Sequence, residues 1–270
     1  MKKVVHSITM LAVAISMISC GGNEPAISSE QALQEVFAAF GNNPEFDETG
    51  FYFEVLNQGN GEPVSTDGFG LVSQISYNAD GTVLGTTGSL PAAVTIGTQS
   101  GAIRESLIKL NIGGSIRVFV PATTGNAGQT AVFDLTAERV FEDVEDFNTT
   151  VIEEFADGEK LETQISDEGL YYTIDDAGEG DNPGPSSRVS VIYEGFHLNG
   201  DVFDSSNGSP ITFGLNQVIR GWTLGIPLYK PGGNGMLIIP SSLAYGQNGN
   251  RGIPPNYPIA FTVELVEVVQ

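Results

Sequence analysis

Two stretches of this chain carry the same pattern of glycine and hydrophobic residues. Residues 50–61 read GFYFEVLNQGNG and residues 169–180 read GLYYTIDDAGEG, which places the two copies 119 positions apart. The matched positions are Gly50, Tyr52, Gly59, Gly61, Val72, Gly81 and Val83 in the first copy and Gly169, Tyr171, Gly178, Gly180, Val191, Gly200 and Val202 in the second. A unit of about 120 residues is too long for a solenoid repeat and has the size of a domain. The chain is therefore expected to fold as two related domains.

Each copy alternates apolar and polar residues over short segments, as half-buried strands do. The alternation covers residues 189–193 and 259–265 of the second copy and residues 133–137 of the first. Asn199-Gly200 predicts a tight hairpin turn between two strands. One helix is predicted by apolar residues near helical spacing, bounded by Pro227 and Pro231: Val218, Ile219, Trp222 and Ile226. A single helix against an antiparallel sheet is an α+β unit, and two such units are expected.

The first residues have the features of a secretory signal peptide. Two lysines precede an apolar run over residues 4–19, which is short for a membrane-spanning helix. Cys20, the single cysteine of the chain, directly follows Ser19, so no intramolecular disulfide can form. A cysteine in this position resembles the lipobox of bacterial lipoproteins, in which the cysteine is lipidated. An ordinary signal peptide cut near Ser19 is the alternative.

The sequence predicts five parts along the chain. They are a lipoprotein signal peptide (1–19), a tether (20–29), a first domain (30–145), a helical linker (146–168) and a second domain (169–270). Apolar residues at helical spacing in residues 29–40 predict a helix at the start of the first domain. The segment TTVIEEFADG predicts a corresponding helix ahead of the second.

The acidic composition excludes one class of partner. The chain has 33 Asp and Glu against 11 Lys and Arg, a net charge of −22, and loss of the two lysines in residues 1–19 would make it −24. Such a charge repels phosphate backbones and anionic lipid alike. Nucleic acid is therefore not expected as a partner, and attachment to a membrane would need a tether such as a lipid on Cys20.

The residues used in ordinary acid-base or metal catalysis are scarce. His197 would be the only histidine left after removal of the signal peptide, and no nucleophile-elbow pattern surrounds a serine. The acidic segment 175–181 does not have the spacing of a calcium-binding loop. No metal site and no cofactor are expected.

The two copies differ in a set of bulky side chains. Tyr193, Phe203, Asp204 and Trp222 of the second copy stand opposite Gln74, Leu84, Gly85 and Ile103 of the first, and Tyr245 has no counterpart. Aromatic residues at strand and helix spacing are usually core residues. Here the first copy completes the same pattern with small or aliphatic residues, which favours a functional role for the set in the second copy.

Four segments of the second copy carry a family resemblance. They are VIYEGFHLNGDVFDSS, ITFGLNQVIRGWTLGI, KPGGNGMLIIPSSLAYG and RGIPPNYPIAFTVELVEV. In this order and spacing they resemble the FKBP-type peptidyl-prolyl cis-trans isomerases, over about residues 165–270. The first copy resembles a degenerate FKBP-like domain. The whole chain is similar to two-domain, lipid-anchored FKBP proteins of bacterial cell envelopes, which implies an outer-membrane location on the periplasmic or surface face.

The resemblance implies a role for each matched residue. It implies catalytic roles for Tyr193, Asp204 and Tyr245, and a substrate pocket formed by Phe203, Val218, Ile219, Trp222, Ile253 and Phe261. Trp222 would be the floor, and Asp204 would accept a hydrogen bond from the Tyr193 hydroxyl. The Ile219 N–H and the Tyr245 hydroxyl would hold substrate carbonyls.

The expected function is prolyl isomerisation of envelope or secreted proteins during folding, with catalysis confined to the second domain. Expected partners are proline-containing polypeptides, a membrane reached through the lipid on Cys20, and macrolide inhibitors. One alternative is a non-catalytic peptide-binding or chaperone lipoprotein that uses the same apolar cleft. A purely structural surface lipoprotein is a further alternative.

Overall fold

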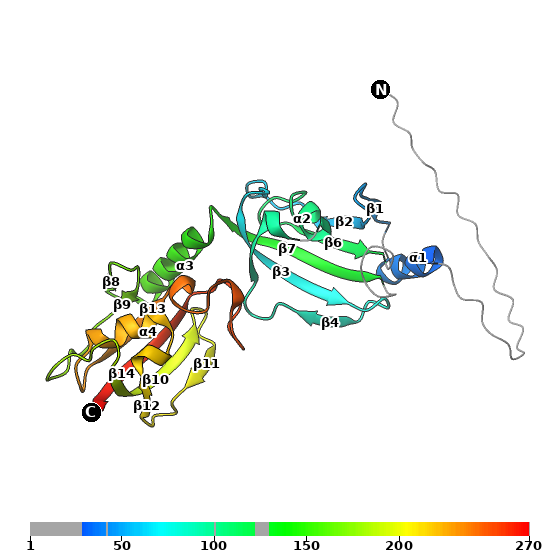
Figure 1. Cartoon of the computed structure of the whole chain (residues 1–270). Coiled ribbons are helices and arrows are strands. Elements are labelled where there is room, and N and C mark those ends of the chain that lie inside the picture. The colour runs from blue at the N-terminus through cyan, green and yellow to red at the C-terminus, as the bar shows by residue number, and fades with distance from the viewer. Residues whose placement is uncertain (1–28, 42, 100, 122–129, 270) are drawn as a thin grey trace, which may run out of the picture.

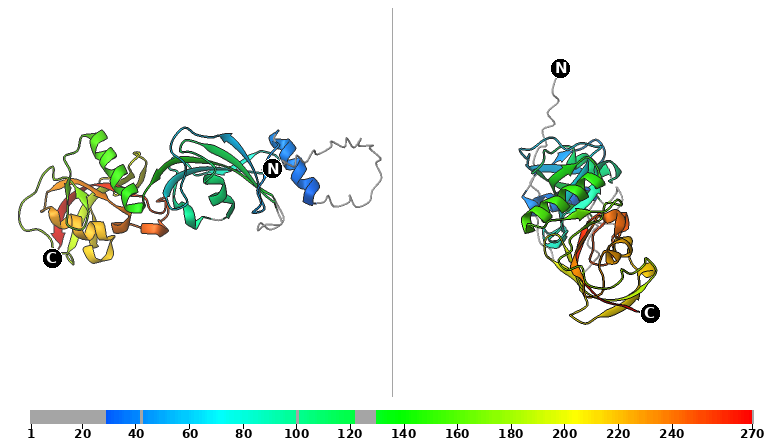
Figure 2. Two further views of the ribbon diagram at one scale, coloured as in Figure 1. Left: turned by 90° about the horizontal axis from the view of Figure 1, so that it is seen from above. Right: turned by 90° about the vertical axis from the view of Figure 1, so that its left-hand side faces the viewer.

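The computed structural model describes residues 29–41, 43–99, 101–121 and 130–269. Two antiparallel sheets lie at opposite ends of the elongated molecule, each with one short helix against it (Figures 1 and 2). The predicted signal peptide, Cys20 and most of the predicted tether lie outside the described residues.

The first domain is the half of the molecule that carries the α1 label in Figure 1. Its elements are α1 (Ser29–Phe40), β1 (Glu45–Phe46), β2 (Tyr52–Asn57), β3 (Phe69–Tyr77), β4 (Val83–Thr86), β5 (Ala92–Thr95), α2 (Gly101–Leu107), β6 (Ser115–Val120) and β7 (Ala131–Phe141). The helix expected over residues 29–40 is α1. Its Phe37 ring packs edge-on against Phe119 of β6, 5.0 Å away between centroids, which attaches the helix to the sheet.

The second domain follows β7. Its elements are α3 (Val144–Glu159), β8 (Gln164–Ile165), β9 (Tyr171–Tyr172), β10 (Arg188–His197), β11 (Val202–Ser205), β12 (Ile211–Gly214), α4 (Arg220–Gly225), β13 (Asn234–Ile239) and β14 (Ile259–Val269). The helix expected from Val218, Ile219, Trp222 and Ile226 forms as α4, which contains only Trp222 of these four and is shorter than predicted. Short 3₁₀ turns flank it at Leu215–Gln217 and Ile226–Leu228. Val218 is extended and separates the first turn from α4.

The two sheets have the same topology. The strand order is β1-β2-β6-β7-β3-β4 in the first, with β5 beside β3, and β8-β9-β13-β14-β10-β11 in the second, with β12 beside β10. The strand register agrees as well, because Ser76 pairs with Phe133 in one sheet and Gly195 pairs with Phe261 in the other. The predicted duplication and α+β class are confirmed.

Helix α3 connects the two sheets. The Asp143 carboxylate accepts hydrogen bonds from two backbone N–H groups of the first turn, which starts the helix. Lys160, in the left-handed conformation with φ 57°, ends it. The linker was expected to be helical over 146–168, but residues 164–165 are extended and pair with β9 at the edge of the second sheet. The predicted domain boundaries remain predictions.

An aromatic cluster joins the two domains around Phe147 of α3. The Phe147 ring lies 5.5 Å from Phe69, 5.2 Å from Phe141 and 5.4 Å from Tyr257, between centroids. Phe69 and Phe141 belong to the first sheet, whereas Tyr257 precedes β14 of the second. Phe147 is fully buried, so this cluster is a small shared core.

Hydrogen bonds add to this interface. The Tyr257 hydroxyl donates to the Pro91 carbonyl, and the Asn256 side-chain amide donates to the Ala93 carbonyl at 3.1 Å. Asn148 of α3 is 4% exposed. Its amide donates to the Asn256 carbonyl at 3.0 Å, and its side-chain oxygen accepts from the Ser241 N–H at 2.6 Å. The loop before β14 is therefore held from α3 and from the first domain.

Among the helices in the described part of the chain, none has the length and apolar character needed to cross a membrane. Within residues 29–41, 43–99, 101–121 and 130–269, no three His, Cys, Asp or Glu side chains form a group that could hold a metal ion.

Candidate functional site

The second domain contains a cavity of about 510 Å³ between its sheet and α4. The lining residues are Tyr193 of β10, Asp204 of β11, Ile211 and Phe213 of β12, Gln217, Val218 and Ile219 before α4, Trp222 of α4, Tyr245, and Phe261 of β14. Tyr193 and Phe261 face the cavity because the sheet directs alternate side chains of each strand to the same side. Apolar side chains with a few polar groups are typical of a ligand pocket.

Aromatic rings form the floor and walls of this cavity. The Trp222 ring meets Tyr193 and Phe261 edge-on, at 5.0 Å between centroids and angles of 84° and 85°. Phe213 lies 5.1 Å from Trp222 on another side. Such edge-to-face contacts favour a single arrangement of the rings. Trp222 is 5% exposed, and this tightly packed indole closes the bottom of the cavity.

A tyrosine and a carboxylate form the polar edge of the cavity. The Tyr193 hydroxyl donates to Asp204 Oδ2 at 2.9 Å, and Asp204 Oδ1 accepts from the Ser205 N–H at 2.9 Å. Burial and the neighbouring Asp204 carboxylate raise the pKa of Tyr193 to about 12. Near neutral pH the phenol therefore keeps its proton and remains a hydrogen-bond donor.

Three donors around the cavity are not used within the described residues. The buried Trp222 Nε1–H has no hydrogen-bond partner there. The Ile219 N–H precedes the first turn of α4, and the Tyr245 hydroxyl lies on the cavity lining; neither makes a hydrogen bond within the same residues. Donors of this kind can bind carbonyl oxygens of a peptide.

Seven of the nine residues assigned from the sequence line this cavity: Tyr193, Asp204, Val218, Ile219, Trp222, Tyr245 and Phe261. The structure differs at Phe203 and Ile253. The Phe203 ring packs behind the cavity, 5.6 Å from Phe261 and 5.1 Å from the His197 ring. Adjacent residues of β11 point to opposite sides, so Phe203 and Asp204 cannot both face the same space. Ile253 is 4% exposed and belongs to the hydrophobic core.

Three lining residues were not assigned from the sequence: Ile211, Phe213 and Gln217. Ile211 and Phe213 are two positions apart on β12, so they share one face of the strand. That spacing in the segment ITFG was the signal that could have identified them. Gln217 lies in a 3₁₀ turn and has no such periodicity.

Gly195 makes room for two of the aromatic rings. A Cβ atom at this position would lie 2.5 Å from the Phe261 ring and 2.9 Å from the Phe203 ring. The register places Ser76 at the same point of the first sheet, opposite Phe133. In the first domain the smaller Leu84 takes the place of Phe203, so the side chain of Ser76 is accommodated. The aromatic cluster of the second domain therefore depends on this glycine.

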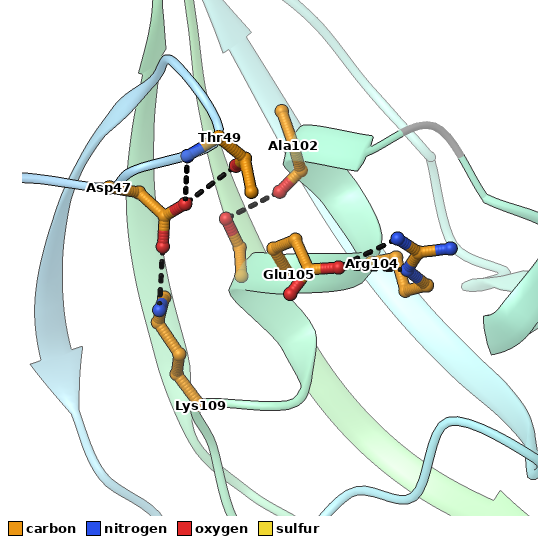
Figure 3. Close-up of polar contacts among 7 residues, drawn as sticks. Asp47, Thr49, Ala102, Arg104, Glu105 and Lys109 are labelled. Atoms are coloured by element: carbon orange, nitrogen blue, oxygen red, sulfur yellow. Dashed lines mark hydrogen bonds and ion pairs between the residues drawn. The ribbon is translucent and has the colours of Figure 1, made fainter.

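The first domain has different contacts around its corresponding helix, α2. Figure 3 shows the Asp47 carboxylate between Thr49 and Lys109, with an ion pair of 2.9 Å to the Lys109 ammonium group. This ion pair and the Thr49 hydrogen bonds lower the pKa of Asp47 to about 2. Arg104 of α2 pairs with Glu105 at 2.7 Å. In this domain Ile103 takes the position of Trp222.

Comparisons with known proteins agree with this geometry. A family model described as FKBP-type peptidyl-prolyl cis-trans isomerase matches residues 180–266. A Haemophilus influenzae protein named "Probable FKBP-type peptidyl-prolyl cis-trans isomerase" is 45% identical over 118 residues, which cover 43% of this chain and 48% of that protein. The Escherichia coli FKBP-type peptidyl-prolyl cis-trans isomerase FkpA is 44% identical over 118 residues, covering 43% of each chain.

The crystal structure of FkpA from Escherichia coli aligns with 47% of this chain and 61% of its own, at 40% identity and a TM-score of 0.43. The chain spans about half the length of the curated relatives it matches. The matched residues include all of the cavity lining, from Tyr193 to Phe261. Over residues 180–266, the second domain is therefore similar to the FKBP-type peptidyl-prolyl cis-trans isomerases.

Proposed function

We propose that the second domain catalyses cis-trans isomerisation of peptide bonds that precede proline. The observation that carries this proposal is the aromatic cavity closed by Trp222, with Ile219 N–H and the Tyr245 hydroxyl as unused hydrogen-bond donors on its lining. A proline ring fits an apolar enclosure, and its flanking carbonyls can accept hydrogen bonds from Ile219 N–H and the Tyr245 hydroxyl. Proline-containing polypeptides are therefore the substrates.

The physical basis is selective binding of the twisted bond. Rotation breaks amide resonance and has a barrier of about 18–20 kcal/mol. Resonance places negative charge on oxygen and positive charge on nitrogen, so a water-poor apolar cavity disfavours the planar bond relative to the twisted one. No covalent bond forms and no general base is needed, which fits a site whose chemistry comes from shape.

The contributions can be compared with the acceleration required. A rate increase of about four to six decades corresponds to roughly 5–8 kcal/mol of preferential transition-state binding. Two hydrogen bonds contribute about 1 kcal/mol each, and enclosure of the proline ring about 2–3 kcal/mol where it favours the twisted form. Positioning of the substrate peptide on the rigid cluster of rings supplies the rest of the transition-state binding energy.

Relaxation of a short Leu-Pro or Phe-Pro peptide from cis to trans tests the activity. The full chain is expected to accelerate the relaxation. Tyr193→Phe removes a hydroxyl and keeps the ring, so the rate constant should fall about threefold to tenfold; Asp204→Leu removes a charged acceptor and should cost about tenfold to a hundredfold. Asp181→Leu changes an exposed acid in the loop between β9 and β10, which is not part of the cavity lining, and serves as the matched control.

A peptide-binding or chaperone lipoprotein without catalysis is the second candidate. The same cavity supports it, because apolar walls and carbonyl-binding donors also suit a bound peptide. A relaxation rate equal to that of buffer, together with measurable peptide binding, would reject isomerisation and leave this reading. The first domain is not catalytic in our proposal, since Gln74, Leu84, Gly85 and Ile103 replace the polar edge and the aromatic floor.

The chain is a lipid-anchored protein of the cell envelope in this proposal. The support is the apolar run over residues 4–19 directly followed by Cys20, and the strong negative charge, which disfavours direct binding to anionic lipid so that membrane attachment needs a tether. Radioactive palmitate should label the wild-type chain in a bacterial host, and Cys20→Ala should abolish the label. Label that persists in Cys20→Ala would reject the anchor.

A further inference from the structure

A second cavity, of about 540 Å³, lies between the two domains. Its lining residues are Thr87, Gly88, Ser89 and Leu90 of the first domain, His197, Asp201, Val202 and Phe203 around the β10–β11 hairpin, and Arg251, Gly252 and Pro254 of the loop before β14. We propose that this interdomain cavity binds the extended segment of a client polypeptide next to the target proline, and that it favours an acidic side chain in that segment. This inference rests on the proposed isomerase function.

The walls of the interdomain cavity are fixed by contacts across the domain boundary. The Ser89 hydroxyl donates to Asp201 Oδ2 at 2.6 Å, which joins the loop after β4 to the β10–β11 hairpin. On the other side, Asn256 and Tyr257 bond the first domain through the Ala93 and Pro91 carbonyls. A cavity held in this way is preorganised, so a ligand does not have to order it.

His197 joins the hairpin to the loop before β14. Its Nε2 lies 2.8 Å from the Gly252 carbonyl oxygen, and the residue is 5% exposed. Its Nδ1 is buried and has no hydrogen-bond partner within the described residues. His197 is one of the lining residues of the interdomain cavity, and a buried polar atom without a partner calls for one. When Nε2 carries the proton, Nδ1 is an acceptor, which suits a peptide N–H group.

Arg251 determines the charge preference. It is the one lysine or arginine on the lining, its side chain is exposed, and it forms no ion pair within the described residues. Asp201, the one carboxylate on the lining, is already bonded to Ser89 and to the Asn199 side-chain amide at 2.9 Å. In a chain with a net charge of −22, Arg251 offers an acidic client segment a local favourable contact.

The interdomain cavity and the aromatic cavity closed by Trp222, here called the proline cavity, lie on opposite sides of strand β11. Phe203 lines the former and its neighbour Asp204 lines the latter, and the Phe203 ring is 5.6 Å from Phe261, which also lines the proline cavity. Strand β11 is the last strand of its sheet, so a client chain can pass over this edge. An extended chain advances about 3.3 Å per residue. Residues three and four positions from the proline lie about 10–13 Å along an extended chain, so side chains there sample the space beyond this edge.

The test compares peptides of two lengths with the full chain. One is a tetrapeptide with a central Leu-Pro bond; the others are about twelve residues long, with glutamates or lysines three and four positions from the proline on both sides. The readouts are kcat/KM for isomerisation and the Kd of fluorescein-labelled peptides by anisotropy. The kcat/KM of the glutamate peptide should be about tenfold higher than that of the tetrapeptide. The glutamate peptide should also bind about tenfold more tightly than the lysine peptide.

Two variants locate the effect. For each protein, we compare the kcat/KM of the long glutamate peptide with the kcat/KM of the tetrapeptide, as a ratio. Arg251→Glu should reverse the preference between the glutamate and lysine peptides. Val202→Trp fills the interdomain cavity from β11. It should bring the ratio of kcat/KM for the long peptide to kcat/KM for the tetrapeptide close to one. Val83→Trp is the matched control, because Val83 occupies the equivalent position of the first domain and is 55% exposed against 54% for Val202. It should leave the ratio as in the wild type.

The outcomes separate this inference from the proposed activity. If the chain accelerates the tetrapeptide but shows equal kcat/KM and Kd for all peptides, the interdomain site is rejected and the isomerase is retained. If no peptide is accelerated but the glutamate peptide binds tighter and loses this advantage in Arg251→Glu and Val202→Trp, the site is retained and the isomerase is rejected. An unchanged charge preference in Arg251→Glu would overturn the assignment of that residue.

Discussion

Replacement of Gly195 by alanine is expected to lower kcat/KM for a prolyl peptide by at least about tenfold and the free energy of unfolding by about 1–3 kcal/mol. The added methyl group would lie 2.5 Å from the Phe261 ring and 2.9 Å from the Phe203 ring. Neither ring is the free end of a flexible chain, because Phe261 packs edge-on against Trp222 and against Phe203 itself. The rings that form the proline cavity must therefore shift.

Ser76→Ala is the matched control for this substitution. Ser76 occupies the same position of the first sheet and already has a Cβ atom, so only the hydrogen bond it accepts from the Gln74 side chain is lost. Its kcat/KM should equal that of the wild type. A double variant, Gly195→Ala with Phe203→Leu, copies the first domain and should recover part of the lost stability. Wild-type activity in Gly195→Ala would show that the placement of Phe261 does not control catalysis.

Replacement of Phe147 by alanine is expected to cost about 3–5 kcal/mol of unfolding free energy and to separate the unfolding of the two domains. Phe147 is fully buried and contacts Phe69, Phe141 and Tyr257, which come from both domains. With the ring gone, the interface keeps its hydrogen bonds but loses its shared apolar core. Urea denaturation followed by Trp222 fluorescence, which reports on the second domain, and by circular dichroism, which reports on both, should then give different midpoints.

Phe46→Ala is the control for the interface variant. Phe46 is 61% exposed and lies in β1, away from the domain boundary. Its substitution should change the unfolding free energy by about 0.5 kcal/mol or less, with the two probes still coincident. Coincident midpoints and a loss below about 1 kcal/mol in Phe147→Ala would show that the aromatic cluster does not couple the domains.

Several features of the fold were predictable because they depend on local patterns. The duplication followed from matched glycines, the strands from alternation such as that of residues 259–265, and the hairpin from Asn199-Gly200. Helix α4 was predicted too long, because apolar spacing cannot distinguish an α-helix from the 3₁₀ turns on either side of it. The extended residues 164–165 were predicted as helix because their partner, β9, is not visible in a periodic pattern.

The candidate site was predictable only in part. The resemblance indicated the residue types, and seven of nine assigned side chains line one cavity. The placement of Phe203 was not predictable from the motif, because the motif does not say on which side of the edge strand each neighbour lies. The contact between Ser89 and Asp201 joins residues 112 positions apart, and no local pattern indicates such a pairing.

The sequence by itself determined two related α+β units, the resemblance of the second unit to a known family, and the aromatic and carboxylate groups that distinguish the second unit from the first. These properties depend on the spacing and type of residues within short segments, and each segment shows them without reference to the rest of the chain. Only the tertiary structure decided which rings face the proline cavity, why Gly195 has no side chain, and that a second cavity opens between the domains. Those properties arise from packing between distant segments, where a difference of one methyl group or one strand face changes which atoms can meet.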